Sequence, residues 1–379
     1  MNTNPAVFHP DPIERVELAI ADLKAGRMVI LVDDEDRENE GDLVIAAELC
    51  TPEAINFMVM HARGLVCLSM TGEQIERLAL PMMATNNQSP YNTAFTVSIE
   101  ARHNVTTGIS AADRAETIRV AIQPDATPRD IVTPGHMFPL RARSGGVLER
   151  VGQTEGSVDL ARMAGMMPAG VICEIIRDDG KMARMPDLMA FGEEHDLKIV
   201  AVADLIKYRM RNERIVSRAG GGAVEVPGMG TFNTRLYRGM RGEHHMALWK
   251  GELGDGPTVV RVQASPPPWS FLGEPTSKLA RQAQAALSRI AEEGGALVLM
   301  HQGGGGAEEI EQAWKRDFTG VDATLPRAQA EALRDLGAGC QILVDLGVSN
   351  LRLLSSSNRP IVGIESYGLT IAETLPLFG

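Results

Sequence analysis

Short apolar runs recur along the first half of the chain, at the length and composition of buried β-strands. They run from Met28 to Val32, Leu43 to Ala46, Leu65 to Met70, Phe95 to Ile99 and Gly170 to Ile176. Amphipathic segments separate them. Asp11 and Pro12 suit the cap and first turn of one helix, and Thr51 and Pro52 suit those of another. This alternation predicts a layered α+β domain.

The pattern changes near Tyr208. Residues 209–222 are basic, then glycine-rich and short of large apolar side chains, which favours an interdomain linker. Beyond it the chain predicts a second, α/β domain, with one long helix at 275–293 and strands at 230–238, 245–248, 258–262, 351–354 and 369–375. We therefore expect two domains, residues 1–210 and 211–379.

Composition excludes several classes of protein. The chain has 379 residues, of which 44% are hydrophobic and 23% charged, with a net charge of -12. Such a charge argues against non-specific binding to nucleic acid or to an anionic membrane. No apolar run approaches the ~20 residues that cross a bilayer, and residues 1–12 do not resemble a secretory signal. Four cysteines without a C-x-x-C pair fit a reducing compartment, so we expect a cytoplasmic protein.

An acidic loop, Asp33 to Asp42, holds seven carboxylates and one arginine, Arg37. Taken alone, such a run is most simply a solvated turn. Here, however, two apolar strands flank it and bring the acids together, so a divalent cation is the natural guest. The guanidinium of Arg37 is then available for a phosphate or hydroxyl group.

Later motifs share their order with a known family. They are Thr107-Gly108-Ile109-Ser110-Ala111, Pro134-Gly135-His136-Met137-Phe138-Pro139-Leu140, Arg150-x-Gly152-Gln153-Thr154-Glu155 and Cys173-Glu174. Together with the acidic loop, they resemble 3,4-dihydroxy-2-butanone 4-phosphate synthase over residues 16–208. That family converts D-ribulose 5-phosphate, a sugar phosphate, to L-3,4-dihydroxy-2-butanone 4-phosphate and formate for riboflavin biosynthesis. The resemblance implies a homodimer with sites at the subunit interface and a requirement for Mg²⁺ or Mn²⁺.

The resemblance also assigns roles to residues. His136 and Glu174 are expected to be catalytic, and Glu38 to bind metal. Substrate contacts are expected from Arg37, Glu38, Asp42, Thr107, Arg150, Thr154 and Glu174. The Thr107-Gly108 segment is expected to offer backbone N–H groups to the phosphate.

Residue chemistry weighs these roles differently. In isolation, His136 is most simply a turn histidine, whereas Glu174 lies in an apolar strand, where a carboxylate is costly unless it is paired or functional. Two positions depart from the family: Gln153 stands where a metal-binding histidine is usual, and Thr133 replaces an arginine often found before the Pro-Gly-His turn. An amide oxygen can still ligate Mg²⁺, so Gln153 remains a candidate metal ligand.

The second domain resembles GTP cyclohydrolase II over most of residues 228–377. That family binds zinc through three cysteines, and those positions here hold Pro266, Ser277 and Leu279, none of which can replace a thiolate. The family's glycine-rich catalytic segment reads His301-Gln302-Gly303-Gly304-Gly305-Gly306 here. We expect no zinc and no GTP cyclohydrolase activity. Two alternatives stay open: a non-catalytic regulatory or binding protein of flavin metabolism, and a bifunctional enzyme.

Overall fold

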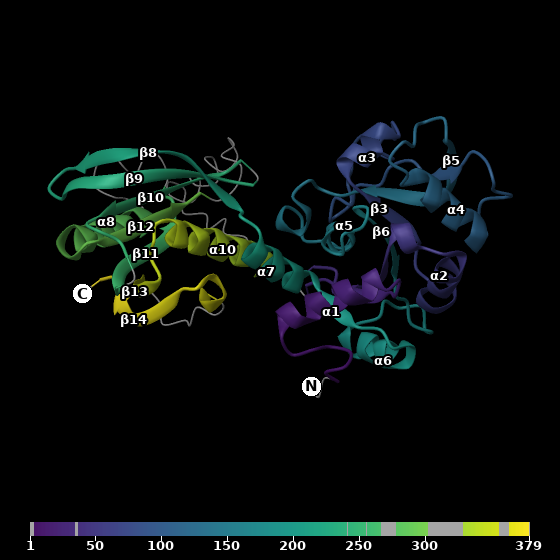
Figure 1. Cartoon of the computed structure of the whole chain (residues 1–379), viewed down its shortest axis with the longest axis horizontal. Helices are drawn as coiled ribbons and strands as arrows, with labels where there is room; N and C mark the ends of the chain where they lie inside the picture. The colour runs from purple at the N-terminus through teal and green to yellow at the C-terminus, as the bar shows by residue number, and fades with distance from the viewer. Residues whose placement is uncertain are drawn as a thin grey trace. The chain divides into compact units, whose positions relative to one another are not determined.

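The computed structural model describes residues 4–34, 37–240, 242–254, 256–266, 278–301, 329–355 and 364–378. By its internal contacts the chain divides into two compact units, Met1–Arg209 and Met210–Gly379. Each unit is built around one sheet of seven described strands (Figure 1). Within the described helices, none is long and apolar enough to cross a bilayer.

The sheet of the first unit has the strand order β4-β5-β3-β6-β2-β1-β7. Its strands are β1 (Val29–Val32), β2 (Gly41–Ala46), β3 (Cys67–Met70), β4 (Ile99–Ala101), β5 (Ile131–Arg141), β6 (Ala169–Glu174) and β7 (Ile199–Ala201). β1 and β2 are buried along their whole length, as their apolar sequence predicts. The acidic loop therefore begins and ends on two core strands, which pair antiparallel.

Helices cover both faces of this sheet. They are α1 (Pro12–Lys24), α2 (Pro52–Phe57), α3 (Gly72–Arg77), α4 (Ala111–Ala121), α5 (Gln153–Met163), α6 (Met185–His195) and α7 (Val202–Asn212), with short turns η1 (Ala47–Leu49), η2 (Met58–Ala62) and η3 (Gly146–Leu148). The predicted caps are present: Asp11 accepts the Ile13 N–H at 2.7 Å, and Thr51 accepts the Ala54 N–H at 3.2 Å.

Helix α5 decides which face of the sheet carries the acidic groups. A Cβ on Gly156 of α5 would lie 2.6 Å from Leu31, and one on Gly170 of β6 would lie 2.7 Å from Ser157. These two glycines allow the helix backbone to lie close against the strands. Asp42 pairs in register with Leu31, and Glu174 alternates with Gly170, so both carboxylates lie on the α5 face.

The second unit has the strand order β14-β13-β11-β12-β10-β9-β8. Its strands are β8 (Val216–Val226), β9 (Gly230–Gly239), β10 (His244–Lys250), β11 (Thr258–Ala264), β12 (Gly295–Met300), β13 (Asn350–Ser355) and β14 (Thr370–Pro376), with helices α8 (Lys278–Glu293) and α10 (Gln329–Asp345) and the turn η5 (Ile364–Tyr367). β11 to β14 pair parallel and β8 to β10 antiparallel, which makes this a mixed α/β sheet.

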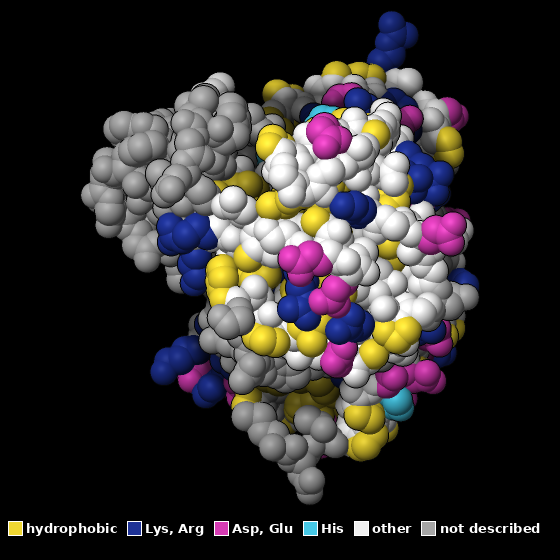
Figure 2. Space-filling model, turned by 90° about the vertical axis from the view of Figure 1, so that its left-hand side faces the viewer, with side chains coloured by type: hydrophobic (Ala, Val, Ile, Leu, Met, Phe, Trp, Pro, Cys, Tyr) yellow, Lys and Arg dark blue, Asp and Glu magenta, His cyan; other side chains and the backbone are white. Residues whose placement is uncertain are grey.

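α8 and α10 cover opposite faces of this sheet. Gln263 of β11 donates to the Leu279 carbonyl of α8 at 2.9 Å, while the preceding Val262 lies against Gly339 of α10. On the face drawn in Figure 2, acidic and basic side chains are interspersed among hydrophobic atoms, so the described part of this face carries no continuous basic surface.

Two expectations from the sequence are wrong. Residues 209–222 are not a linker: α7 continues to Asn212, and Gly220–Gly222 lie within β8, which pairs with β9 along its length. Cross-strand hydrogen bonds, which composition does not reveal, hold this glycine-rich strand. The run from Phe95 to Ile99 is not one strand either, because only single bridges form at Phe95 and Thr96 before β4 begins at Ile99.

Candidate active site

The candidate site lies at the ends of β2 and β6. Asp42, which closes the acidic loop, and Glu174 are direct partners in this antiparallel pair. Asp42 is 4% exposed. The Glu174 carboxylate accepts the Leu65 N–H at 2.8 Å. Gly64 is required here, since a Cβ would lie 2.6 Å from the same carboxylate. The two acids are thus held side by side, Asp42 buried and Glu174 half-buried.

Burial controls the protonation of this pair. Desolvation raises the pKa of Asp42 well above its usual range, and the negative charges of Glu174 and Glu38 raise it further. Desolvation also raises the pKa of Glu174, against the opposing effect of its backbone hydrogen bonds. The pKa of Glu40 is raised in the same way. Carboxyls that retain protons at higher pH are suited to proton transfer.

Arg37 is the main cation beside these acids. Its Nη2 lies 2.7 Å from a Glu38 carboxylate oxygen, and its Nη1 donates to Asp33 at 2.8 Å and to Gln153 Oε1 at 2.9 Å. Asp33 also accepts the backbone N–H groups of Glu38 and Glu40, at 3.0 and 2.8 Å. Asp33 therefore shapes the loop, while Arg37 joins the loop to the first residue of α5.

Tyr91 connects Arg37 to Arg150. Its hydroxyl donates to the Arg37 carbonyl at 2.8 Å, and its ring centre lies 5.0 Å from the Arg37 guanidinium. Its own carbonyl accepts from Arg150 Nη2 at 3.1 Å. Arg150 is also paired with the buried Glu155 at 2.6 Å. The two arginines expected to bind substrate are thus linked through one tyrosine.

His136 belongs to a second group of residues. Its Nδ1 lies 2.8 Å from Glu100 Oε2, and Gly108 packs so closely on Glu100 that a Cβ would lie 1.3 Å from the other carboxylate oxygen. Cys67 of β3 pairs with Phe138 on one side and Ile172 on the other. Two residues further toward the same end of the sheet, this register places His136 of β5 level with Glu174 of β6. Because β3 lies between them, the two residues are two strand spacings, or about 10 Å, apart.

The Thr107 segment is shaped by Asp113, which accepts the Thr106 and Gly108 N–H groups, each at 3.0 Å. These two amides are therefore already engaged, and Thr107 stays the predicted phosphate contact of the segment. Hydrogen bonds donated to the Asp113 carboxylate, above all the one from the Thr106 hydroxyl, lower the pKa of Asp113 to about 2. Thr107 therefore belongs to a loop that supports Glu100 and His136.

Direct contacts and electrostatic interactions join five of the predicted residues, namely Arg37, Glu38, Asp42, Gln153 and Glu174. Thr154 follows Gln153 at the start of α5 and is buried. Tyr91, Glu100 and Asp33 were not predicted from the sequence. Asp33 was visible in the acidic loop, but Tyr91 and Glu100 lie 54 and 36 residues from the groups they contact, without a local signal.

The sequence profile of 3,4-dihydroxy-2-butanone 4-phosphate synthase matches residues 17–208. The chain belongs to the 3,4-dihydroxy-2-butanone 4-phosphate synthase family. It is accordingly a lyase. The profile of GTP cyclohydrolase II matches residues 221–376. The resemblance inferred from the motifs of both units is thereby confirmed, as is the mixed α/β fold in two parts.

Relatives of this synthase family match along the whole chain. The riboflavin biosynthesis protein RibBA of Aquifex aeolicus is 50% identical over 96% of this chain and 92% of its own. A 3,4-dihydroxy-2-butanone 4-phosphate synthase of Neisseria meningitidis is 48% identical over 96% of this chain and 97% of its own. The solved structure of RibBX, a two-domain synthase from A. baumannii, is 42% identical, with a TM-score of 0.77 over 95% of this chain and 99% of that one. Another solved synthase, in complex with two magnesium ions, is 44% identical over 50% of this chain and 94% of its own, with a TM-score of 0.49.

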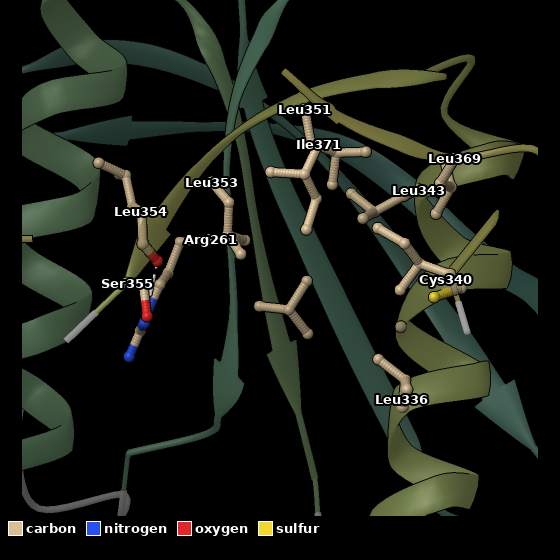
Figure 3. Close-up of a pocket in the computed structure, with 13 residues that line it drawn as sticks. Arg261, Leu336, Cys340, Leu343, Leu351, Leu353, Leu354, Ser355, Leu369 and Ile371 are labelled. Carbon is tan, nitrogen blue, oxygen red and sulfur yellow. Dashed lines mark hydrogen bonds between the residues drawn. The ribbon is translucent and has the colours of Figure 1, made fainter. Parts of the chain in front are cut away.

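The positions of the cyclohydrolase zinc ligands are partly described. Pro266 follows β11, and Leu279 lies in the first turn of α8. Ser277, Gln302 and the glycine run 303–306 lie outside the described residues. Between α10 and the sheet lies a cavity of about 100 Å³ lined mainly by apolar side chains, among them Cys340, Leu343, Leu351 and Ile371 (Figure 3). This lining does not resemble a polar catalytic centre.

Proposed function

We propose that this protein converts D-ribulose 5-phosphate to L-3,4-dihydroxy-2-butanone 4-phosphate and formate in riboflavin biosynthesis. The observation that carries the proposal is the pair of the buried Asp42 and the half-buried Glu174, both with raised pKa values, at the same sheet end as Arg37 and His136. We propose residues 1–210 as the synthase domain and residues 211–379 as a cyclohydrolase II-like domain.

The reaction needs proton removal beside a ketone, loss of a hydroxyl and a carbon shift, so several acids and bases must act in turn. Arg37 and Arg150 offer guanidinium donors to phosphate and hydroxyl oxygens. With its Nδ1–H donating to Glu100, His136 keeps Nε2 for accepting a proton. Asp42 and Glu174 hold protons that leaving oxygens can take up, because burial disfavours their charged forms.

We propose Mg²⁺ or Mn²⁺ as the cofactor, held by Glu38 and Gln153. The donor chemistry fits: five carboxyls interact here, and both ligands offer hard oxygen atoms. Among the described residues no three His, Cys, Asp or Glu side chains form a metal cage. Mg²⁺ commonly takes only one or two carboxylates and completes its shell with water and substrate oxygens. When bound, the ion polarises adjacent substrate oxygens.

We also propose a homodimer with sites at the subunit interface. Val59, Met60 and Leu65 are apolar and 39%, 60% and 42% exposed, and the Leu65 N–H bonds to Glu174. Exposed apolar side chains beside a catalytic carboxyl favour a partner surface there. No role for nucleic acid or membrane is proposed.

We propose that the second unit binds no zinc and does not hydrolyse GTP, since Pro266 and Leu279 stand at two of the ligand positions. Two other functions remain to be separated from this one by assay. The cyclohydrolase match over residues 221–376 favours a bifunctional enzyme. The change to Gln153 favours a non-catalytic regulatory protein of flavin metabolism.

The deciding experiment incubates the full chain, after treatment with EDTA, with ribulose 5-phosphate and either Mg²⁺ or Mn²⁺. Formate and the four-carbon phosphate should appear with metal, and Glu174→Gln should release at least about 100-fold less. No formate from folded, metal-loaded protein would support the regulatory function. GTP and zinc are then supplied together, and formate released from GTP would establish the bifunctional enzyme instead.

A further inference from the structure

Arg37 occupies the space between the two proposed metal ligands. One end of its guanidinium lies 2.7 Å from Glu38 Oε1, and the other donates to Gln153 Oε1 at 2.9 Å. The Arg37 side chain is only 16% exposed, and Gln153 is 5% exposed. These are charge-assisted contacts in a partly buried site, where such hydrogen bonds are stronger than in water.

The same oxygens cannot serve the guanidinium and an ion together. Mg²⁺ holds its oxygen ligands at about 2.0–2.1 Å. An ion in contact with both oxygens would lie where the guanidinium nitrogens now lie and would repel their positive charge. Asp33 would keep its contacts with the loop amides, so the loop itself need not change for the arginine to leave.

We propose that Arg37 is the resident cation of the metal-free site, and that metal entry displaces its guanidinium and frees it for the anionic end of the sugar phosphate. Metal and sugar phosphate then bind with positive coupling, because each favours the state with Arg37 released. The identity of the sugar phosphate rests on the proposed function.

Tyr91 offers the released guanidinium its next position. Its ring already lies 5.0 Å from the Arg37 guanidinium, and its carbonyl already holds Arg150. A cation that turns away from Glu38 can stay on the aromatic face and face the same anion as Arg150. The displaced arginine thus remains within the site.

The first test measures Mn²⁺ binding to the full chain by electron paramagnetic resonance, without substrate. Arg37→Met should bind Mn²⁺ at least ten-fold more tightly than the wild type. The matched control is Arg184→Met, because Arg184 bonds to the Glu38 carbonyl at 2.6 Å and lies 4.0 Å from Glu40 but contacts neither proposed ligand side chain. It removes the same charge from beside the same loop and should tighten binding less than three-fold.

Equal tightening in the two variants would assign the effect to charge alone and overturn the proposal, as would weaker binding in Arg37→Met. A second measurement does not depend on a variant folding. In wild-type protein labelled with ¹⁵N-arginine, saturating Mg²⁺ should move the Arg37 Nε resonance. An arginine spectrum unchanged by saturating Mg²⁺ would also overturn the proposal.

The coupling is tested with D-ribose 5-phosphate, a sugar phosphate without the ketone. In the wild type it should tighten Mn²⁺ binding by the same factor by which Mn²⁺ tightens its own binding. Arg37→Met should lose this factor, and equal coupling in both proteins would count against a displaced arginine. If the chain released no formate from ribulose 5-phosphate, the proposed reaction would fail while the Mn²⁺ result stood on its own.

Discussion

Gly108→Ala should disable His136 without touching it. Gly108 has φ of +88°, and an added Cβ would lie 1.3 Å from Glu100 Oε1. Heavy atoms at such a site rarely approach within 3.0 Å, so the carboxylate would have to move by about 3.0 minus 1.3, or 1.7 Å. The Glu100 oxygen that now lies 2.8 Å from His136 Nδ1 would move with it.

The size of the effect follows from two separate costs. An alanine in the left-handed region costs about 1–2 kcal/mol of stability. Misplacing a catalytic group by about 1 Å can cost on the order of 100-fold in rate, so kcat should fall by about that factor. KM should change little, because the arginines expected to bind substrate lie in the other group of residues.

Gly165→Ala provides the matched control. Gly165 has φ of +79°, and a Cβ added there would meet nothing within 4 Å, so its alanine variant carries the backbone strain alone. Urea denaturation should show a loss of about 1–2 kcal/mol for Gly165→Ala and at least as large a loss for Gly108→Ala, whereas formate release should fall only in Gly108→Ala. A Gly108→Ala enzyme with the kcat of Gly165→Ala would refute the role of Glu100 in positioning His136.

Three further outcomes are expected. Burial raises the pKa of Asp42 in the folded chain above its unfolded value, so the folded state loses stability as pH rises between the two values and Asp42 ionises. Asp42→Asn should therefore stabilise the metal-free protein by roughly 1–3 kcal/mol at pH 7. Urea denaturation should show no stabilisation near pH 3, where Asp42 is protonated in both states. Burial raises the pKa of Cys173 to about 12, so a short iodoacetamide pulse at pH 8 should label it only after unfolding, and labelling of native protein would contradict this. In α10, Gly339→Ala should raise Tm by about 2–4 °C through the higher helix propensity of alanine, because the side chain that its Cβ would meet at 3.1 Å lines a cavity and can shift into it. Gly337→Ala should lower Tm, because its Cβ would lie 1.9 Å from Met210.

Much of the fold could be predicted because its signals are local. The apolar run Val29–Val32 can lie only in a core, and Asp11 and Thr51 cap helices with their own next turns. β8 could not be predicted in this way. Its glycines and exposed side chains have the composition of a linker, and only pairing with β9 makes the segment a strand.

The candidate site shows the same division. The acidic loop and the β6 carboxylate were visible because charge in or beside an apolar strand requires an explanation. The supporting residues were not. Tyr91 joins two arginines through its backbone and its ring, and Glu100 reaches His136 across a strand pair, so neither contact leaves a pattern in the sequence.

Helix α7 limits how such a gene can be split or recombined. The boundary between the two units falls inside it, after Arg209. Arg209 is 3% exposed and lies 2.7 Å from the fully buried carboxylate of Asp159, and it also donates to the Gly145 carbonyl at 2.8 Å. Removing one partner of a buried ion pair costs at most about 3–5 kcal/mol, and the cost is lower here because Arg162 also lies 3.2 Å from Asp159. A gene fission that ended the first product at Tyr208 would leave Asp159 without this arginine, whereas one placed after Asn212 would pass on a complete helix.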